Sequence, residues 1–286
     1  LDLVMPNLDG VGVLRSSKER ADAPRFVVVS MAGEESDLGI EALELGAFDV
    51  VTKPTGLATD ELYDVADELR KTVLAAGNRT RAPVAPLSAP PFHASPAFAV
   101  KTSLVVIGAS TGGPQALTQI LRGLPADFPV PIAIVLHMPE GYTEAFARRV
   151  DADAKLDVME ARHGLELVAG RAVVARAGMH LVVEAGNPLR CALELTPTTT
   201  HRPSVDVLFR SAAEVVKEGV LGVVLTGMGN DGLEGARAID AAGGRVLTES
   251  EASCVVYGMP RVVVEAGLSH ASISLRSMAE SILQRL

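Results

Sequence analysis

The fold of this chain is decided by the stretch Leu104-Val105-Val106-Ile107-Gly108-Ala109-Ser110-Thr111-Gly112-Gly113. Its first four residues form an apolar run that predicts a buried strand, and a helix-like segment begins near Pro114. A serine between small residues at such a turn matches the G-x-S-x-G pattern, in which the turn exposes the hydroxyl. The helix start also offers backbone N–H groups that can stabilise an oxyanion. We therefore predict that Ser110 is an exposed nucleophile.

Strands and helices alternate on the C-terminal side of this stretch. Further strands are predicted at Ile132–Leu136, Gly222–Leu225 and around Val246-Leu247, and helices at Gln115–Gly123, Thr143–Val150, Val205–Gly219 and Leu233–Ala242. Strands that alternate with helices indicate a parallel sheet. The predicted fold class is therefore α/β, with a doubly wound parallel-sheet catalytic domain over 102–286. Short apolar runs and glycine turns over Leu165–Leu195 predict a β insertion within it.

A smaller unit is predicted on the N-terminal side. Residues 78–101 are rich in Pro, Ala, Ser and Thr, which excludes a helix or an interior strand and predicts a semi-extended linker. Residues 1–77 contain strand-like runs at Phe26–Val29 and Phe48–Val51, and helix-like segments at Ser36–Gly46 and Glu61–Ala76. The sequence thus predicts two α/β domains joined by a Pro/Ala-rich linker.

The composition excludes several classes of function. The net charge of −9 at pH 7 opposes binding to nucleic acid, whose phosphates favour a basic surface. No apolar run approaches the ~20 residues that span a bilayer, so we expect no direct membrane insertion. Cys191 and Cys254 lack the spacing of a metal site and are expected to be reduced. These features predict a cytoplasmic protein.

Two further strand ends carry candidate partners for Ser110. His137 follows the strand Ile132–Leu136, where a neutral imidazole can accept the serine proton and return it to a leaving group. Asp231 lies in a glycine-rich turn after another apolar strand and can accept a hydrogen bond from the second imidazole nitrogen. For Asp231 the alternative is a residue that caps a helix. The chain order Ser, His, Asp differs from the Ser, Asp, His order of α/β-hydrolases.

Three polar residues of the N-terminal unit also follow predicted strands. Asp2, Ser30 and Lys53 each stand where a strand ends, and the carboxyl ends of parallel strands form the functional edge of an open sheet. A carboxylate, a hydroxyl and a charge-neutralising lysine would together form a phosphoryl-acceptor site. Spacing alone leaves open the alternative that all three are ordinary polar residues of loops.

With these residues in view, the domain from about Thr102 to Leu286 closely resembles the catalytic domain of the chemotaxis protein-glutamate methylesterase (CheB) family. The resemblance rests on five segments in order: Ile107–Gly113, His137–Pro139, His201–Phe209, Thr226–Gly232 and Ala252–Pro260. It implies Ser110 as nucleophile, His137 as general base and Asp231 as the orienting acid. The Thr111 and Met228 amides are the implied donors to the oxyanion. The implied reaction is hydrolysis of glutamyl γ-methyl esters on chemotaxis receptors, with deamidation of receptor glutamines as a second activity and no metal or other cofactor.

Residues 1–77 resemble a response-regulator receiver, which is a flavodoxin-like domain. The similar segments are Leu1–Gly10, Val29–Met31 and Thr52–Pro54. The resemblance implies Asp2 as phosphoacceptor, Ser30 and Lys53 as switch residues, and the histidine kinase of the chemotaxis system as phosphodonor. The first two strands, the first helix and the acidic pair that binds Mg²⁺ have no counterpart, so we expect a truncated receiver without its Mg²⁺ site.

Two alternative functions remain open at this point. A dinucleotide-binding domain also places glycine-rich turns after strands, but the stretch from Gly108 to Gly113 does not match G-x-G-x-x-G. A catalytically silent module that binds receptors would be compatible with the same sequence, because sequence alone does not establish geometry. Arg202 is a further candidate, either to steer an acidic receptor helix or as an ordinary solvated arginine.

Overall fold

The computed structural model describes residues 1–18, 20, 22–31, 35–53, 59–77 and 101–286. The predicted linker over 78–101 lies outside the described residues except for Lys101. The C-terminal part is built on a seven-stranded sheet in the order β12-β11-β10-β3-β4-β7-β5, in which all neighbours are parallel. Its strands are β3 (Leu104–Ala109), β4 (Ile132–Leu136), β5 (Asp157–Glu160), β7 (Arg171–Val174), β10 (Val220–Val224), β11 (Arg245–Glu249) and β12 (Ala271–Ile273).

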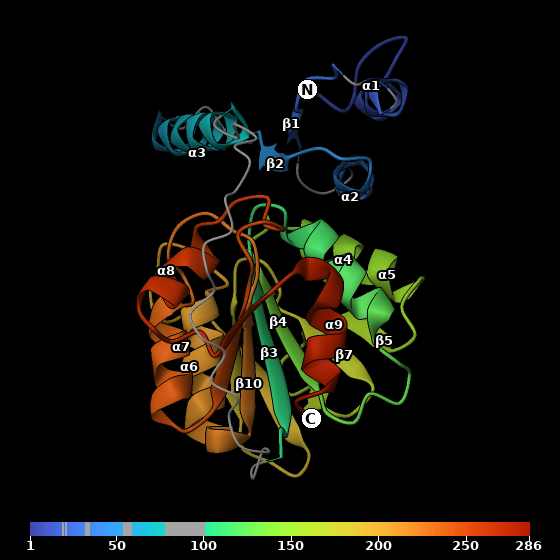
Figure 1. Ribbon diagram of the computed structural model, residues 1–286. Helices are drawn as coiled ribbons and strands as arrows, with labels where there is room; N and C mark the ends of the chain where they lie inside the picture. Colours follow the sequence, from blue (N-terminus) through green and yellow to red (C-terminus); the bar gives the residue numbers. More distant parts are fainter. Residues whose placement is uncertain (19, 21, 32–34, 54–58, 78–100) are drawn as a thin grey trace.

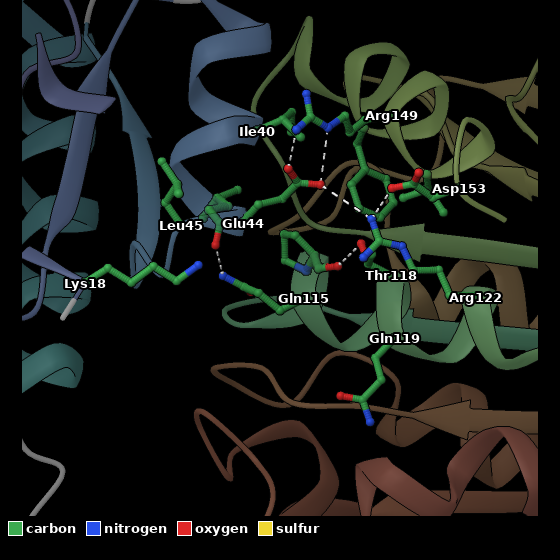
Figure 2. Close-up of a pocket in the computed structure, with 14 residues that line it drawn as sticks. Lys18, Ile40, Glu44, Leu45, Gln115, Thr118, Gln119, Arg122, Arg149 and Asp153 are labelled. Carbon is green, nitrogen blue, oxygen red and sulfur yellow. Dashed lines mark hydrogen bonds and ion pairs between the residues drawn. The ribbon is translucent and has the colours of Figure 1, made fainter. Parts of the chain in front are cut away.

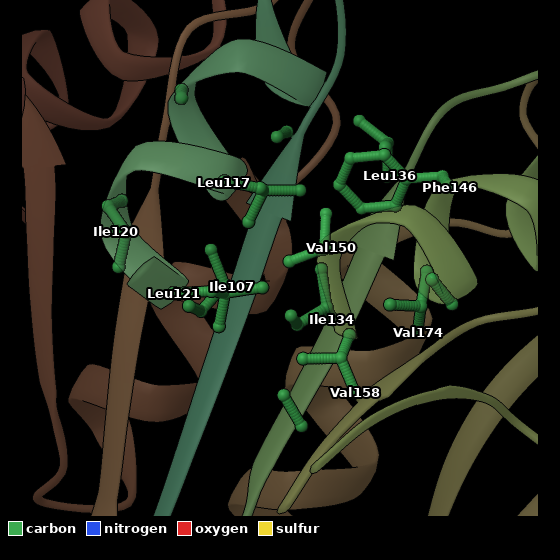
Figure 3. Close-up of a cluster of buried hydrophobic side chains, with 14 of the residues drawn as sticks. Ile107, Leu117, Ile120, Leu121, Ile134, Leu136, Phe146, Val150, Val158 and Val174 are labelled. Carbon is green, nitrogen blue, oxygen red and sulfur yellow. The ribbon is translucent and has the colours of Figure 1, made fainter. Parts of the chain in front are cut away.

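Helices cover both faces of this sheet, which confirms the predicted doubly wound α/β class. One face carries α4 (Gly113–Gly123), α5 (Tyr142–Asp151) and α9 (Leu275–Leu283), and the other carries α6 (Val205–Val216), α7 (Leu233–Ala241) and α8 (Met259–Glu265) (Figure 1). Successive side chains of a strand point to opposite faces. Ile107 therefore packs in the core beneath α4 and α5, together with Leu117 and Phe146 (Figure 3), whereas Val106 packs in the core beneath α6.

The carboxyl ends of β3 and β10 form the switch point of the sheet. β3 is hydrogen-bonded to both β4 and β10. From β3 the chain continues to β4 on one side, whereas β10 leads to β11 and β12 on the other. The helices that follow β3 and β10 diverge to opposite faces of the sheet (Figure 1). In doubly wound sheets such a divergence opens a crevice that binds ligands.

The predicted β insertion over Leu165–Leu195 is only partly present. β6 (Glu166–Leu167), β8 (His180–Glu184) and β9 (Leu189–Glu194) form a separate three-stranded antiparallel sheet. β7, by contrast, lies inside the large parallel sheet between β4 and β5. Its residues Ala172, Val173 and Val174 are fully buried, as expected for a strand covered on both faces. From the sequence, the short apolar run of β7 could not be assigned to the large sheet rather than to the insertion.

The N-terminal part contains a two-stranded parallel sheet of β1 (Val27–Ser30) and β2 (Asp49–Thr52), and Asp2 adds one parallel bridge to Val29. Its helices are α1 (Gly10–Ser17), α2 (Ser36–Glu44) and α3 (Thr59–Gly77). α1 was not predicted from the sequence. Its start is capped by the Asp9 carboxylate, which accepts from Gly12 N at 2.6 Å. This part lies over the carboxyl edge of the large sheet (Figure 1).

Candidate active site

Ser110 follows β3 directly, at the switch point of the sheet. Its N–H donates to Thr226 O (3.0 Å), which ties the turn after β3 to the turn after β10. The left-handed conformation within this turn is adopted by Gly112 (φ 79°) and not by the serine. A Cβ on Gly112 would lie 2.5 Å from Val255 Cβ, so both the backbone and the available space require glycine there. The glycine that this turn requires thus stands two residues after Ser110.

His137 lies beside Ser110 because β4 is the neighbour of β3. Its N–H donates to Ala109 O (3.0 Å), which extends the sheet pairing by one residue. The His137 Nε2 atom lies 2.8 Å from Asp231 Oδ2, whereas Nδ1 is buried and has no hydrogen-bond partner among the described residues. A carboxylate on Nε2 places the proton on that nitrogen and leaves Nδ1 as the basic atom. The structure therefore brings His137 and Asp231 together and assigns Nδ1 as the candidate base.

Asp231 is held in its ionised form. Its carboxylate also accepts hydrogen bonds from Ser204 Oγ (2.9 Å), Val205 N (2.7 Å) and Asp206 N (3.0 Å). Burial opposes ionisation, but the bond to His137, its charge and the two amides outweigh burial and lower the pKa of Asp231 to about 2. Asp231 therefore also caps a helix, the alternative considered from the sequence. That helix is the distant α6, and not α7, which follows Asp231 in the chain.

Asp206 of α6, in turn, caps α7, the helix that follows Asp231 in the chain. Its Oδ1 accepts from Gly232 N (2.9 Å) and Gly235 N (2.7 Å) at the start of α7. The two helix starts are thus joined by a reciprocal pair of carboxylates. Sequence reasoning missed Asp206, although Ser and Asp beside the start of a predicted helix are a recognisable capping signal.

His201 is a second residue that sequence reasoning passed over, because it follows no strand. The structure stacks its ring on that of His137, with centroids 4.3 Å apart and planes inclined by 21°. Arg202, the weaker candidate, donates from Nη1 to Leu195 O (3.0 Å) and lines the same pocket. Only the tertiary structure brings this loop, which begins after β9, to the end of β4.

The backbone amides of Thr111 and Met228 are the candidate donors to an oxyanion. In the described part of the chain, neither amide donates a hydrogen bond to the backbone of another turn or loop. Thr226 fixes the two turns that carry them, because its Oγ1 donates to Thr111 O (2.9 Å) and accepts from Val256 N (2.9 Å). Behind it, buried Glu249 accepts from Thr226 N (2.9 Å). Thr111 and Met228 therefore stay the candidate oxyanion donors.

The pocket that holds these groups is shared with the N-terminal part. Ser110, Thr111, Met228, His137 and His201 line it together with residues of β2 and α3. Asp49 of β2 is the closest link, since Thr111 Oγ1 donates to Asp49 Oδ2 at 2.7 Å. Burial raises the pKa of Asp49 although the bond from Thr111 opposes that shift. The N-terminal part therefore covers the crevice and puts a carboxyl group beside the residue that follows Ser110.

A second contact region between the two parts surrounds a pocket formed by α2, α4 and α5 (Figure 2). Gln115 Nε2 donates to Leu43 O (2.7 Å), and Arg149 Nη2 pairs with Glu44 Oε2 (2.7 Å). Tyr142 is fully buried, and a Cβ on Gly39 would lie 2.4 Å from its ring. The two parts are therefore packed closely as well as joined by ion pairs.

The predicted phosphoryl-acceptor residues are only partly brought together. Lys53 Nζ lies 2.6 Å from Asp2 Oδ2, and this bond lowers the pKa of Asp2. Ser30 instead donates from Oγ to Glu35 Oε2 (2.6 Å). Within the described ranges, no group of three His, Cys, Asp or Glu side chains is arranged to hold a metal ion. The described residues around Asp2 do not form the oxygen-ligand set that Mg²⁺ prefers.

A serine, a histidine and an aspartate at the switch point of a doubly wound sheet are the residue types of the triad that is typical of serine hydrolases. Comparison with known protein families narrows this class to one family. Residues 105–282 match the family model described as CheB methylesterase, and residues 1–66 match the response regulator receiver domain. The chain therefore belongs to the CheB methylesterase family, with a receiver-like N-terminal part.

Individual relatives agree with this assignment. Protein-glutamate methylesterase/protein-glutamine glutaminase 5 of Myxococcus xanthus is 57% identical over 97% of this chain and 81% of its own length. A protein of the same activities by name from Bordetella bronchiseptica is 40% identical over 100% of this chain and 83% of its own. The crystal structure of the Thermotoga maritima CheB methylesterase catalytic domain, at 38% identity, superposes with a TM-score of 0.63 over 65% of this chain and 100% of that domain. Separately, no helix in the described part of this chain is both long and apolar enough to cross a membrane.

Proposed function

We propose that this protein hydrolyses glutamyl γ-methyl esters of chemotaxis receptors and deamidates receptor glutamines through the same acyl intermediate. One observation carries the proposal. The Asp231 carboxylate binds His137 Nε2 at 2.8 Å, the second ring nitrogen, Nδ1, has no hydrogen-bond partner among the described residues, and His137 and Ser110 line the same pocket. The names of the relatives from Myxococcus xanthus and Bordetella bronchiseptica, which give both activities, support the choice of substrates.

The acylation step uses each of these groups. Ser110 Oγ attacks the γ-carbonyl carbon while His137 Nδ1 takes the hydroxyl proton, and ionised Asp231 stabilises the imidazolium. The negative charge that develops on the carbonyl oxygen is bound by the amides of Thr111 and Met228. When the tetrahedral intermediate collapses, the bond to the methoxy group breaks and His137 returns the proton, which releases methanol. A glutamine side chain releases ammonia at the same step.

The deacylation step restores the enzyme. A water molecule gives a proton to His137 Nδ1 and attacks the acyl carbon, the bond to Ser110 Oγ breaks, and the serine regains its proton. The product is a free glutamate carboxylate on the receptor. This sequence needs no redox change and draws every proton from groups of this chain or from water, so we assign the ester chemistry no cofactor.

The proposed partners follow from the substrates. Methylated glutamates would lie on the cytoplasmic helices of the receptors, so we assign the enzyme to the cytoplasm. The histidine kinase of the same chemotaxis system is the proposed partner of the receiver-like part, in which Lys53 and Asp2 form an ion pair.

The test is methanol release from membranes that contain methylated receptors. We expect Ser110→Ala to lower the turnover number by about 10³-fold or more, because Ser110 Oγ is the atom that is acylated in the proposed mechanism. Ammonia release from receptor glutamines should fall in parallel. Ser277→Ala, a change of an exposed serine in α9, is the matched control and should leave both rates unchanged. Methanol release that persists in Ser110→Ala would exclude the serine mechanism, and a wild-type protein that binds receptors without releasing methanol would favour a silent binding module.

A further inference from the structure

The ring of His137 is held at its edge by Asp231 and on its face by His201. The hydrogen bond from Nε2 to Asp231 Oδ2 fixes one point of the ring, but a single bond of this kind allows the ring to tilt about its own axis. Nδ1 has no hydrogen-bond partner among the described residues and does not limit that motion. The stacked ring of His201, 4.3 Å away and inclined by 21°, does limit it.

The loop that carries His201 is itself fixed at several points. Thr199 Oγ1 donates to His201 O (2.6 Å), and Gly178 N donates to Arg202 O (3.0 Å). Two residues later, Ser204 N donates to buried His180 Nδ1 (3.2 Å), and Ser204 Oγ reaches Asp231. His201 is therefore attached to the same frame that positions Asp231. A fixed loop can hold a ring in place, whereas a free loop could not.

The surroundings of His201 also favour its neutral form. Partial desolvation lowers the pKa of His201, and the charge of His137 and that of Lys71 in α3 act in the same direction, whereas Asp231 opposes them. Arg202, Asp49, Asp67 and Glu68 line the same pocket. A neutral ring next to His137 favours the reaction, because two stacked imidazolium rings would repel one another when His137 takes the serine proton.

We propose that His201 is a positioning residue for the reaction assigned above: its neutral ring holds the plane of His137 so that Nδ1 faces Ser110. This inference rests on the proposed function only for the identity of the reaction. The orientation of His137 is a property of the protein without substrate and is measured separately.

The first experiment compares three substitutions at His201 in the full chain. His201→Ala removes the stacked ring, and we expect the turnover number for methanol release to fall about tenfold with KM changed less than twofold, because misplacement of a catalytic group costs rate more than binding. His201→Phe restores a stacked ring without charge and should recover most of the loss. His201→Arg places a permanent cation against His137 and should shift the acidic limb of the pH profile to lower pH. A turnover number unchanged in His201→Ala, or no rescue by Phe in a folded protein, would overturn the proposal.

The second experiment does not depend on the substrate. In protein labelled with ¹⁵N-histidine, the His137 Nε2 proton that faces Asp231 should give a slowly exchanging signal at low field. We expect this signal to persist in His201→Phe and to broaden or disappear in His201→Ala. If the signal behaves in this way but the wild type releases no methanol, the proposed function fails while the positioning role stands. If the signal is equal in all variants, the positioning role fails.

Discussion

At the scale of single residues, Asp231 is the most constrained group of the site. Its carboxylate accepts hydrogen bonds from His137, from a hydroxyl group and from two helix amides. All four partners favour the charged form, which explains why the pKa of Asp231 falls to about 2 in spite of burial. An acid with a lowered pKa stabilises the folded state above its ordinary pKa of 3.8, and this contribution is lost as the pH falls through the folded value near 2.

The lowered pKa of Asp231 leads to a prediction for the stability of Asp231→Asn. The substitution should lower the free energy of unfolding by about 2 kcal/mol at neutral pH, and the difference from the wild type should shrink between pH 4 and pH 2. Urea unfolding at a series of pH values measures it. The control is Glu249→Gln. Burial raises the pKa of Glu249, so the wild type should lose stability relative to this variant as the pH rises above 4.5. Two variants with the same pH trend would contradict the assignment of the charges.

At the scale of elements, the reciprocal capping of α6 and α7 positions the site. Asp231 precedes α7 and caps α6, while Asp206 belongs to α6 and caps α7. The two helices lie side by side on the same face of the sheet (Figure 1). A shift of either helix start would therefore move the carboxylate that binds His137.

The predicted consequence concerns Asp206→Ala. Two buried helix N–H groups lose their acceptor, so we expect the free energy of unfolding to fall by about 2 kcal/mol. The turnover number should fall as well, because α7 loses the anchor that places Asp231. Asp206→Asn keeps an oxygen acceptor and is the matched control, with less than half of either effect. Thermal unfolding and methanol release test both, and an active Asp206→Ala enzyme of wild-type stability would refute the link.

At the scale of the whole molecule, the N-terminal part closes over the pocket that contains the candidate catalytic residues. The contacts between the N-terminal part and the large-sheet part differ in strength. The Arg148–Asp37 pair joins side chains that are 63% and 71% exposed, and exposed ion pairs contribute little. The bond from Thr111 to Asp49 lies inside the pocket, where a hydrogen bond is less exposed to competition from water.

We therefore expect Asp49→Ala to raise the rate of receptor demethylation. Loss of about 1 kcal/mol of interface stability would increase the fraction of open molecules, and with it kcat/KM, by about fivefold. Arg148→Ala is the control at the same interface and should change kcat/KM by less than twofold. The measurement is the initial rate of methanol release at low receptor concentration. An unchanged or lower rate in Asp49→Ala would show that the contact with Thr111 does not restrict the site.

Much of the fold followed from local patterns. The strand β4 coincides with its predicted residues, and β3 and α4 differ from theirs by one or two residues, because a continuous apolar run and a glycine turn are strong signals. β7 was misplaced because four residues do not reveal which sheet they join. For the site, strand ends identified Ser110, His137 and Asp231 as candidates that share one edge. His201 and Asp206 follow no strand, so strand ends did not select them, and the capping signal at Asp206 indicates a helix start and not a site.

The sequence by itself determined the alternation of strands and helices, the family, and the three strand-end residues, since each follows from short-range periodicity and motif. Only the tertiary structure decided which imidazole nitrogen binds Asp231, which helix Asp231 caps, and which side chains of the N-terminal part meet the pocket. The physical reason is distance along the chain. His137 meets Asp231 across 94 positions and Thr111 meets Asp49 across 62, and such contacts depend on packing that no local pattern encodes.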